Sequence, residues 1–393
     1  MTTQLTFNGR HYALDRYPAG QKNRSLQAWD AADILLIEQA LAFLAQKPES
    51  QILLINDQFG AISTILTDHI PAHQVYVVQD SWVGHAAIKQ NIAANDKQLP
   101  RLLTSTDKWP PVDLVLLKLP HNHSYLHYVL AQCRAILPQA TPLIACAKAK
   151  DIHRNVVSLI SREYGEAHAS LTIKKCRYIN ATLQPTPEQS DYHPIVWTLA
   201  DHQLQVVNHA NVFAREQLDI GARFLLQHLP KFELPYETPC ETNVDTPKRV
   251  IDLGCGNGVL GLAMLAQDPK VQVLFSDDSA LAIASAAASV EANNPSWLTR
   301  SNFVQDDCLS QQADQSADLV LCNPPFHQQQ AVTDHIAWQM FTDARRVLVK
   351  GGRLRIVANR HLGYSEKLAR LFGGCIHIAS NAKFTILEAI KRK

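Results

Sequence analysis

The sequence lacks the cysteine patterns that hold zinc or build a disulfide framework. Its eight cysteines are scattered along 393 residues, and no two of them form a CxxC pair. Structural zinc sites and disulfide-rich domains both depend on closely spaced cysteines. We therefore expect reduced thiols and no bound metal ion.

Long hydrophobic runs are missing as well. A membrane-spanning helix needs roughly 18 or more consecutive apolar residues, and no run in this chain reaches that length. Residues 1–10 do not have the charged-then-apolar order of a secretory signal peptide. These absences predict a cytoplasmic protein without membrane contact, and nothing in the sequence indicates an obligate protein partner.

Charge of one sign is not in excess either, because the formal net charge is +1 at pH 7. A nearly neutral protein exerts no overall attraction on a polyanion, so contact with nucleic acid would require local basic patches. The chain does have 46% hydrophobic and 19% charged residues, a composition typical of folded enzymes. Its length favours two domains of roughly 200 residues each.

The two halves of the chain carry the same succession of motifs. In each half a β-rich run is followed by a turn that ends in glycine and by a helical pattern. One offset of 198 positions relates three pairs of residues: Gly60 and Gly258, Asp80 and Asp278, Asn95 and Asn293. Runs 112–116 and 317–321 resemble each other at an offset of 205, as a loop insertion would produce. Open α/β folds in general share such alternation, but a constant offset favours duplication.

Alternating strand and helix patterns in both halves predict parallel βαβ units. We predict an α/β fold with two tandem Rossmann-like, doubly wound domains, residues 1–185 and 194–393. A polar stretch within 183–193 is the expected linker, and a second irregular segment, 232–248, precedes the glycine turn of the second half.

That glycine turn follows a predicted strand directly. Gly256, Gly258 and Gly261 satisfy the dinucleotide pattern GxGxxG, which alone is a weak signal. Asp252 opens an overlapping DxGxGxG pattern, which resembles motif I of class I methyltransferases. A carboxylate before the turn suits the ammonium group of a methionine tail and would repel a pyrophosphate. We therefore expect S-adenosylmethionine here, bound by the residues of the turn: Asp252, Gly254, Gly256, Asn257 and Gly258.

Acidic residues end the next two β-rich runs. Asp277 and Asp278 lie some twenty residues after the turn, where a carboxylate can accept hydrogen bonds from both ribose hydroxyls. We favour Asp277, which is nearer the strand end, and keep Asp278 as the alternative. The methyltransferase resemblance places Asp307 at the adenine amino group. The ordinary alternative for such loop acids is a solvated turn or a helix cap.

The first half lacks these features. Leu54, Asn56, Gln58 and Gln79 stand, at the offset of 198, where the second half has Asp252, Gly254, Gly256 and Asp277. Of the glycines in the DxGxGxG turn of the second half, only Gly258 is matched by a glycine in the first half, Gly60. The first domain is therefore predicted to be a degenerate copy that does not bind this cofactor.

A second motif follows the apolar run 319–322. Asn323, Pro324, Pro325 and Phe326 form an NPPF tetrapeptide that resembles motif IV of amino-group methyltransferases. The prolines fix the backbone, so the Asn323 side-chain oxygen and the Pro324 carbonyl can both accept N–H bonds from a planar amine. Phe326 is expected to stack on the nucleobase that carries this amine. The first half has Lys118-Leu119-Pro120-His121 here, which cannot form this clamp.

These motifs together resemble one family. The segments 208–213 and 218–224, DLGCGNGVLGL, CNPPFHQQ and the run 357–362 are similar to ribosomal RNA guanine-N2 methyltransferases. The first half, through residues 26–29, 56–60 and 147–153, is similar to the large-subunit branch of that family. The resemblance implies two tandem class I methyltransferase domains, the first degenerate, a seven-stranded catalytic sheet, ribosomal RNA as partner and N2-methylguanosine as product.

Other readings remain open. A nicotinamide dehydrogenase would use the glycine turn but has no reason for NPPF. A protein-glutamine N5 methyltransferase uses a similar clamp, normally with Tyr in the fourth position. A non-catalytic RNA-binding assembly factor would not need intact motifs in the second half.

Basic residues of the first half predict where RNA is held. They form two groups, Lys148, Lys150 and Arg154, and Lys174, Lys175 and Arg177. Solvated surface charge is the ordinary alternative for each group. Because the degenerate domain has no evident chemistry of its own, we predict that it binds RNA through these groups.

Overall fold

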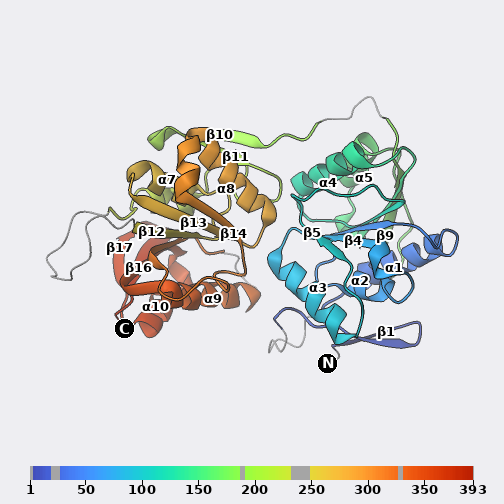
Figure 1. Ribbon diagram of the computed structural model, residues 1–393, viewed down its shortest axis with the longest axis horizontal. Coiled ribbons are helices and arrows are strands. Elements are labelled where there is room, and N and C mark those ends of the chain that lie inside the picture. Colours follow the sequence, from blue (N-terminus) through green and yellow to red (C-terminus); the bar gives the residue numbers. More distant parts are fainter. Residues whose placement is uncertain (1–2, 19–26, 186–190, 232–247, 326–330, 393) are drawn as a thin grey trace. The chain divides into compact units, whose positions relative to one another are not determined.

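The chain divides into two compact units, residues 1–193 and 194–393. The computed structural model describes residues 3–18, 27–185, 191–231, 248–325 and 331–392. Each unit contains a seven-stranded sheet with helices on both faces (Figure 1). Among the described helices, none has the length and apolarity needed to cross a bilayer.

The sheet of the first unit is built around two strands that are apolar at nearly every position. Because both faces of such a sheet are covered, its central strands are continuous hydrophobic runs, not alternating ones. In spatial order the strands are β5 (Arg101–Leu103), β4 (Val75–Val78), β3 (Ile52–Ile55), β6 (Leu114–Lys118), β7 (Pro142–Lys148), β9 (Cys176–Thr182) and β8 (His168–Ala169). The first five are parallel, β9 is antiparallel to β7, and β8 is antiparallel to β9.

The sheet of the second unit has the same order. Its strands are β14 (Ser301–Gln305), β13 (Val271–Asp277), β12 (Lys248–Leu253), β15 (Ala317–Cys322), β16 (Leu348–Asn359), β18 (Phe384–Ile390) and β17 (Ile376–Ser380). Again the first five strands are parallel, β18 is antiparallel to β16, and β17 is antiparallel to β18. The predicted α/β fold with two Rossmann-like sheets is confirmed, with an antiparallel pair added at one edge of each sheet.

Strand register relates the two units residue by residue. Ile52 pairs with Val75 in the first sheet, and Val250 pairs with Val273 in the second, so both members are shifted by 198 positions. Across the next pair of strands, Leu114 corresponds to Leu319, a shift of 205. The two offsets seen in the sequence, 198 and 205, are therefore the offsets that relate equivalent strand positions in the two sheets.

Helices cover both faces of each sheet. In the first unit α1 (Ala31–Leu44), α2 (Ala61–Leu66) and α3 (Trp82–Ala94) share one apolar core, while α4 (His123–Ile136) packs on α5 (Arg154–Glu163). In the second unit α6 (Ile220–Leu226), α7 (Val259–Gln267) and α8 (Ala280–Asn293) share one core. A separate core on the other face contains α9 (Ala331–Val347) and α10 (Tyr364–Phe372).

An antiparallel hairpin precedes the sheet in each unit, and the sequence analysis did not anticipate it. The hairpins are β1 (Gln4–Phe7) with β2 (Arg10–Ala13), and β10 (Ile195–Leu199) with β11 (Leu204–Asn208). The Asn95 side chain exchanges hydrogen bonds of 2.9 and 2.7 Å with the backbone of Ala13. Asn293 does the same with Gln205, at 2.9 and 2.7 Å. The asparagine pair that helped reveal the repeat therefore ties each hairpin to its domain.

Candidate active site

The glycine turn of the second unit joins β12 to α7 at the carboxyl edge of the sheet. The backbone N–H groups of Gly254 and Cys255 donate to Ser276 O of β13, at 2.8 and 3.0 Å, which fixes the turn against the neighbouring strand. Gly256 has φ +54°, and a Cβ there would have open space around it. The turn thus presents bare backbone to whatever occupies this edge, as a close-fitting cofactor requires.

Gly258 and Gly60 are glycines for a different reason. Gly258 has φ +79°, and a Cβ there would lie 2.9 Å from the Ala286 Cβ of α8. Gly60 has φ +82°, and its Cβ would lie 2.9 Å from the Ile88 Cα of α3. The glycine common to both turns serves helix packing, whereas at Gly256, whose counterpart is Gln58, a Cβ would meet open space and it is the positive φ that favours glycine.

Asp252 is buried beneath the turn, with 1% of its surface exposed. One carboxylate oxygen accepts a 2.8 Å hydrogen bond from Gly261 N, while Oδ1 has no partner among the described residues. Burial raises the pKa of Asp252 from 3.8 to about 7; the Gly261 bond lowers this pKa, and the nearby charge of Asp277 raises it by a smaller amount. A buried carboxylate oxygen without a hydrogen bond destabilises the fold. A ligand with a cationic or hydrogen-bond-donating group would therefore be stabilised at this position.

Asp277 is the last residue of β13, and its carboxylate is held at the glycine turn. Gly256 N donates to one oxygen at 2.9 Å, and Ser279 N donates to the other at 3.0 Å. Asp278 is placed differently, because its backbone carbonyl accepts a 2.8 Å bond from Gln305 Nε2. The structure therefore brings the Asp277 carboxylate into contact with the turn.

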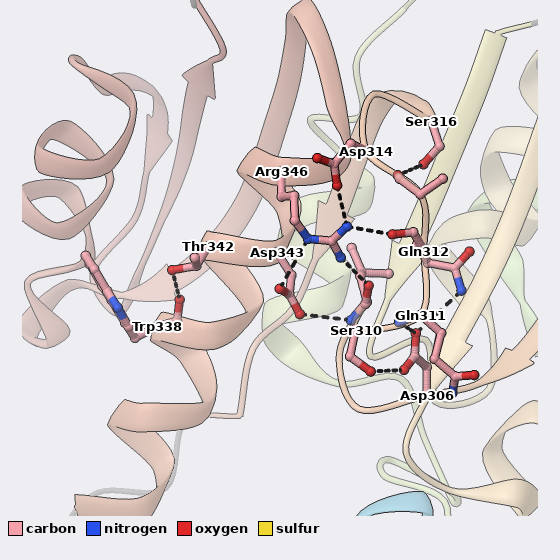
Figure 2. A network of polar contacts seen from close by, with 12 residues as sticks. Asp306, Ser310, Gln311, Gln312, Asp314, Ser316, Trp338, Thr342, Asp343 and Arg346 are labelled. Atoms are coloured by element: carbon pink, nitrogen blue, oxygen red, sulfur yellow. Dashed lines mark hydrogen bonds and ion pairs between the residues drawn. The ribbon is translucent and has the colours of Figure 1, made fainter. Parts of the chain in front are cut away.

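The loop after β14 contains two neighbouring acids, Asp306 and Asp307, which differ in burial and in their contacts. Asp306 is fully buried, and its carboxylate accepts hydrogen bonds from Ser310 Oγ at 2.6 Å and from Gln311 N at 3.0 Å. It closes the loop on itself, as Figure 2 shows. Asp307 beside it is partly exposed at the same sheet edge as Asp277. The choice of Asp307 for a ligand contact is consistent with this difference.

Helix α9 anchors that loop from the other side (Figure 2). Arg346 donates to Leu309 O at 2.6 Å and to Gln312 O at 2.6 Å. Asp343 accepts from Leu309 N at 3.3 Å, and burial raises the pKa of its carboxyl. The position of Asp307 thus depends on two side chains more than thirty residues away in the sequence.

Asn257 was expected to bind the cofactor, and its side chain has partners within the protein. It is 5% exposed, donates a 2.9 Å hydrogen bond from Nδ2 to Asn208 Oδ1, and accepts one from Val259 N at 3.3 Å. Asn208 ends β11, so this contact joins the turn to the hairpin. The side chain of Asn257 therefore shapes the turn.

The NPPF motif begins where β15 ends, on the strand next to β12. Asn323 donates from Nδ2 to Asp219 Oδ2 at 3.1 Å, while its Oδ1 is buried and has no partner in the described part of the chain. Pro324 is buried and Pro325 half-buried. Phe326 lies outside the described residues. An acceptor oxygen without a donor is what the predicted amine clamp requires at this point.

Asp219 is a site residue that the sequence analysis did not single out. It caps α6 by accepting a 2.9 Å bond from Ala222 N, and the same oxygen accepts from Asn323 Nδ2. Because Asp219 accepts from Asn323 Nδ2, it orients the Asn323 amide so that Oδ1 is the atom available to a ligand. The available signal was an N-cap aspartate before a helical pattern, but 104 residues separate it from Asn323.

The first unit fills the corresponding place with an ion cluster. Lys118 ends β6 at the position of Asn323, and its amine contacts the carboxylates of Asp30, at 2.7 Å, and Asp33. Burial lowers the pKa of Lys118, but the two carboxylates raise it more, so the amine stays charged. Asp30 caps α1 as Asp219 caps α6. The acceptor of the second unit is thus replaced by a paired cation, which cannot hold an amine.

The two basic groups of the first unit meet at the carboxyl end of β7. Ala149 N donates to Lys175 O at 2.8 Å, which places the turn after β7 beside the turn before β9. Lys174 and Lys175 form that second turn with φ +47° and +66°, a conformation that residues with side chains adopt at some cost.

The members of these groups differ in their partners. Lys148 lies 3.6 Å from an Asp30 oxygen and Lys174 lies 3.9 Å from Glu38. Arg177 is half-buried, and its Nε donates to Ser170 O at 2.6 Å. Lys150, Arg154 and Lys175 are exposed, and within the described residues they form no ion pair.

No metal site is apparent in the part of the chain that the structure describes, where no group of three or more His, Cys, Asp or Glu side chains is placed to hold an ion. Described cysteines such as Cys255 and Cys322 are buried and free. Burial raises the pKa of both thiols well above the ordinary value, so they are unreactive at neutral pH.

Comparisons with known proteins agree with the two-unit plan. A family model described as RLMG N-terminal domain matches residues 2–185, and one described as Methyltransferase small domain matches residues 203–388. The chain is 43% identical over 397 residues to ribosomal RNA large subunit methyltransferase G of Pseudoalteromonas translucida, covering 100% of this chain and 99% of that protein. The protein of the same name from Aeromonas salmonicida is 46% identical over 400 residues, covering 100% of both.

A solved structure shares the fold over nearly the whole chain. It is the T. thermophilus 16S rRNA N2 methyltransferase RsmC, in complex with AdoMet and guanosine. The TM-score is 0.73 at 19% sequence identity, and the match covers 99% of this chain and 98% of that one.

Proposed function

Because the chain belongs to the ribosomal RNA large subunit methyltransferase G family, we propose that it methylates the exocyclic N2 amine of a guanine in large-subunit ribosomal RNA. The product is N2-methylguanosine, and the methyl donor is S-adenosylmethionine. The observation that carries this proposal is the buried Oδ1 of Asn323, which has no partner among the described residues and stands on the same sheet edge as Asp277 and the glycine turn. The reaction takes place in the cytoplasm, where ribosomal RNA is made and folded.

Cofactor binding is assigned to residues of the second unit. The Oδ1 of Asp252, which has no partner in the described part of the chain, accepts from the ammonium group of the methionine tail, and the bare backbone at Gly254, Gly256 and Gly258 allows close approach. Asp277 accepts from the ribose hydroxyls, and Asp307 accepts from the adenine amine. The bound cofactor supplies an electrophilic methyl group on a sulfonium. Asn257 contributes by shaping the turn.

The clamp orients the amine that reacts. Asn323 Oδ1 and the Pro324 carbonyl accept its two N–H bonds, so that its lone pair is directed at the methyl group for in-line displacement. Asp219 holds the Asn323 amide in the required sense. Phe326 is assigned to stacking on the target base, an interaction that contributes about 1–3 kcal/mol in single-stranded complexes.

The activity is tested by incubating the full chain with radiolabelled S-adenosylmethionine and either large-subunit ribosomal RNA or total cell protein. Nucleoside digestion and mass analysis are expected to recover label in N2-methylguanosine. Label in glutamine would support a protein methyltransferase instead. RNA binding without any transfer would support an assembly factor.

The first unit is proposed to hold RNA while the second modifies it. The two groups Lys148, Lys150, Arg154 and Lys174, Lys175, Arg177 meet at one corner of the sheet, which supports a single basic surface. The exposed cations that form no ion pair with a described residue, Lys150, Arg154 and Lys175, are assigned to phosphate contacts. Arg177 is assigned to holding the hairpin, because its guanidinium bonds to Ser170 O.

Replacing Lys150 and Lys175 together with alanine is expected to weaken RNA binding. The log–log salt dependence should flatten by about 0.7 to 0.9 per lost phosphate contact, because fewer counterions are released on binding. Filter binding at several salt concentrations measures both effects. A matched control, Lys47→Ala with Arg101→Ala, removes the same charge from the loop after α1 and from the first residue of β5. Equal effects from both pairs would contradict a localised surface.

Cofactor binding is expected to weaken on acidification because of Asp252. Between pH 3.8 and about 7 the folded protein retains a proton on this carboxyl that the unfolded chain releases, so the unliganded fold loses stability progressively as the pH rises through that window. An ammonium partner favours the ionised form, so affinity for S-adenosylmethionine should rise roughly tenfold between pH 5.5 and 7. Calorimetric titration measures this. In Asp252→Asn the rise should be absent, and an unchanged pH profile in that variant would show that another group is responsible.

A further inference from the structure

We propose that a cavity beside the amine clamp binds the ribonucleotide adjacent to the target guanine. The cavity has a volume of about 510 Å³ and is lined by Asn359, Arg360, His361, Ala382 and Lys383. This inference rests on the proposed function, because the ligand is part of the same RNA. It adds a subsite that lies outside the glycine turn and the NPPF motif.

Two segments that are distant in sequence form the cavity. Asn359 ends β16 and is followed by a short 3-10 turn, η5 (Arg360–Leu362), while Ala382 and Lys383 lie in the turn between β17 and β18. Arg360 N donates to Lys383 O at 3.1 Å, which fixes one turn against the other. The Asn381 side chain accepts from Lys383 N at 2.9 Å and from Phe384 N at 2.7 Å, so the second turn is held as well.

Its position relates it to the reacting amine. β15 and β16 are parallel, with Cys322 opposite Ile356, so Asn323 follows on one strand and Asn359 ends the next. With strands about 4.8 Å apart and a rise of about 3.3 Å per residue, the two backbones are roughly 8 Å apart. A base held at Asn323 therefore has its neighbouring nucleotide within reach of this cavity.

The polar groups define the class of ligand. Asn359 is 7% exposed, and its Oδ1 has no hydrogen-bond donor among the described residues. Arg360 and Lys383 are exposed and form no ion pair within the same residues; the Arg360 guanidinium reaches only Asn381 O, at 3.5 Å. A ligand that satisfies both features carries an anion and a hydrogen-bond donor. A phosphodiester with a ribose 2′-hydroxyl has both, whereas DNA lacks the donor.

The first unit offers an internal comparison. The register of β7 with β9 and of β16 with β18 places Lys148 at the position of Asn359 and Lys175 at that of Lys383. The contact between Ala149 N and Lys175 O repeats the one between Arg360 N and Lys383 O. Cations therefore occur at this corner in both units, although the cofactor residues occur in only one. Their charge thus has a use that is separate from cofactor binding.

The test uses the full chain and a fragment of large-subunit ribosomal RNA that it methylates. Arg360→Ala with Lys383→Ala is expected to raise KM for RNA about tenfold, as loss of charge-assisted hydrogen bonds does, and to flatten the salt dependence by about 0.7 per lost contact. Affinity for S-adenosylmethionine should not change. Lys248→Ala with Lys270→Ala, at the amino ends of β12 and β13, is the matched control and should leave KM as it is.

A second arm tests the role of Asn359. Once the methylated guanine is located, fragments with a single 2′-deoxy substitution at each flanking nucleotide are compared. One of them should raise KM with the wild-type chain and have no further effect with Asn359→Ala. Wild-type KM and salt dependence in the Arg360 and Lys383 variant, or equal 2′-deoxy penalties in both chains, would overturn the inference. Failure of the wild-type chain to methylate any RNA would instead overturn the proposed function.

Discussion

Replacing Asn323 with alanine is expected to lower the turnover number about 10²- to 10³-fold, the effect of removing one oriented polar group from a transition state. The variant loses the acceptor that turns the amine toward the methyl group, while Pro324 and the glycine turn are unchanged. Affinity for S-adenosylmethionine should therefore barely change. Single-turnover rates with saturating RNA, combined with calorimetric titration of the cofactor, measure the two quantities separately.

Asp219 provides the matched variant for that experiment. Serine in place of Asp219 can still cap α6, so thermal stability should be close to that of the wild type, but the Asn323 amide loses the partner seen at 3.1 Å. Turnover should fall less than in Asn323→Ala, and the double variant should be no slower than Asn323→Ala alone. Full activity of Asn323→Ala, or loss of its cofactor binding, would show that Asn323 does not act as the clamp.

The repeated fold could be predicted from the sequence because its markers carry physical constraints. Gly60 and Gly258 are needed because a Cβ at either position would lie 2.9 Å from an atom of the neighbouring helix. Asn95 and Asn293 recur because each ties a hairpin to a helix end. The hairpins themselves were missed, since four- and five-residue strands give too short a pattern to separate from loops.

Contacts between distant residues account for the rest of what the sequence analysis did not find. NPPF marks the proposed clamp, but the contact of Asn323 with Asp219 could not be predicted, because an N-cap aspartate is ordinary wherever a helix begins. The contacts of Lys118 with Asp30 and Asp33 likewise join residues that are distant in sequence, with separations of 88 and 85 positions. Charge groups that looked separate in sequence, such as those at Lys150 and Lys175, become neighbours only through the pairing of β7 with β9.

Replacing Asp277 with alanine is expected to lower affinity for S-adenosylmethionine on the order of 10²-fold or more, since two hydrogen bonds to a charged acceptor are lost. The same carboxylate also holds Gly256 N and Ser279 N, so the turn loses its support at the same time. Calorimetric titration of the wild-type chain should give one site per chain. In Asp277→Ala that site should become too weak to measure at the same concentrations.

Two control variants make the single-site prediction specific. Asp278→Ala should bind almost as well as the wild type, because the ribose contact is assigned to Asp277 and alanine retains the Asp278 backbone carbonyl that accepts from Gln305. Gln79→Ala should leave the stoichiometry at one, because Gln79 is the counterpart of Asp277 in a unit where Gln58 replaces the open glycine and Lys118 closes the clamp. Two sites in the wild type would mean that the first unit still binds the cofactor. Stronger loss in Asp278→Ala than in Asp277→Ala would move the ribose contact to Asp278.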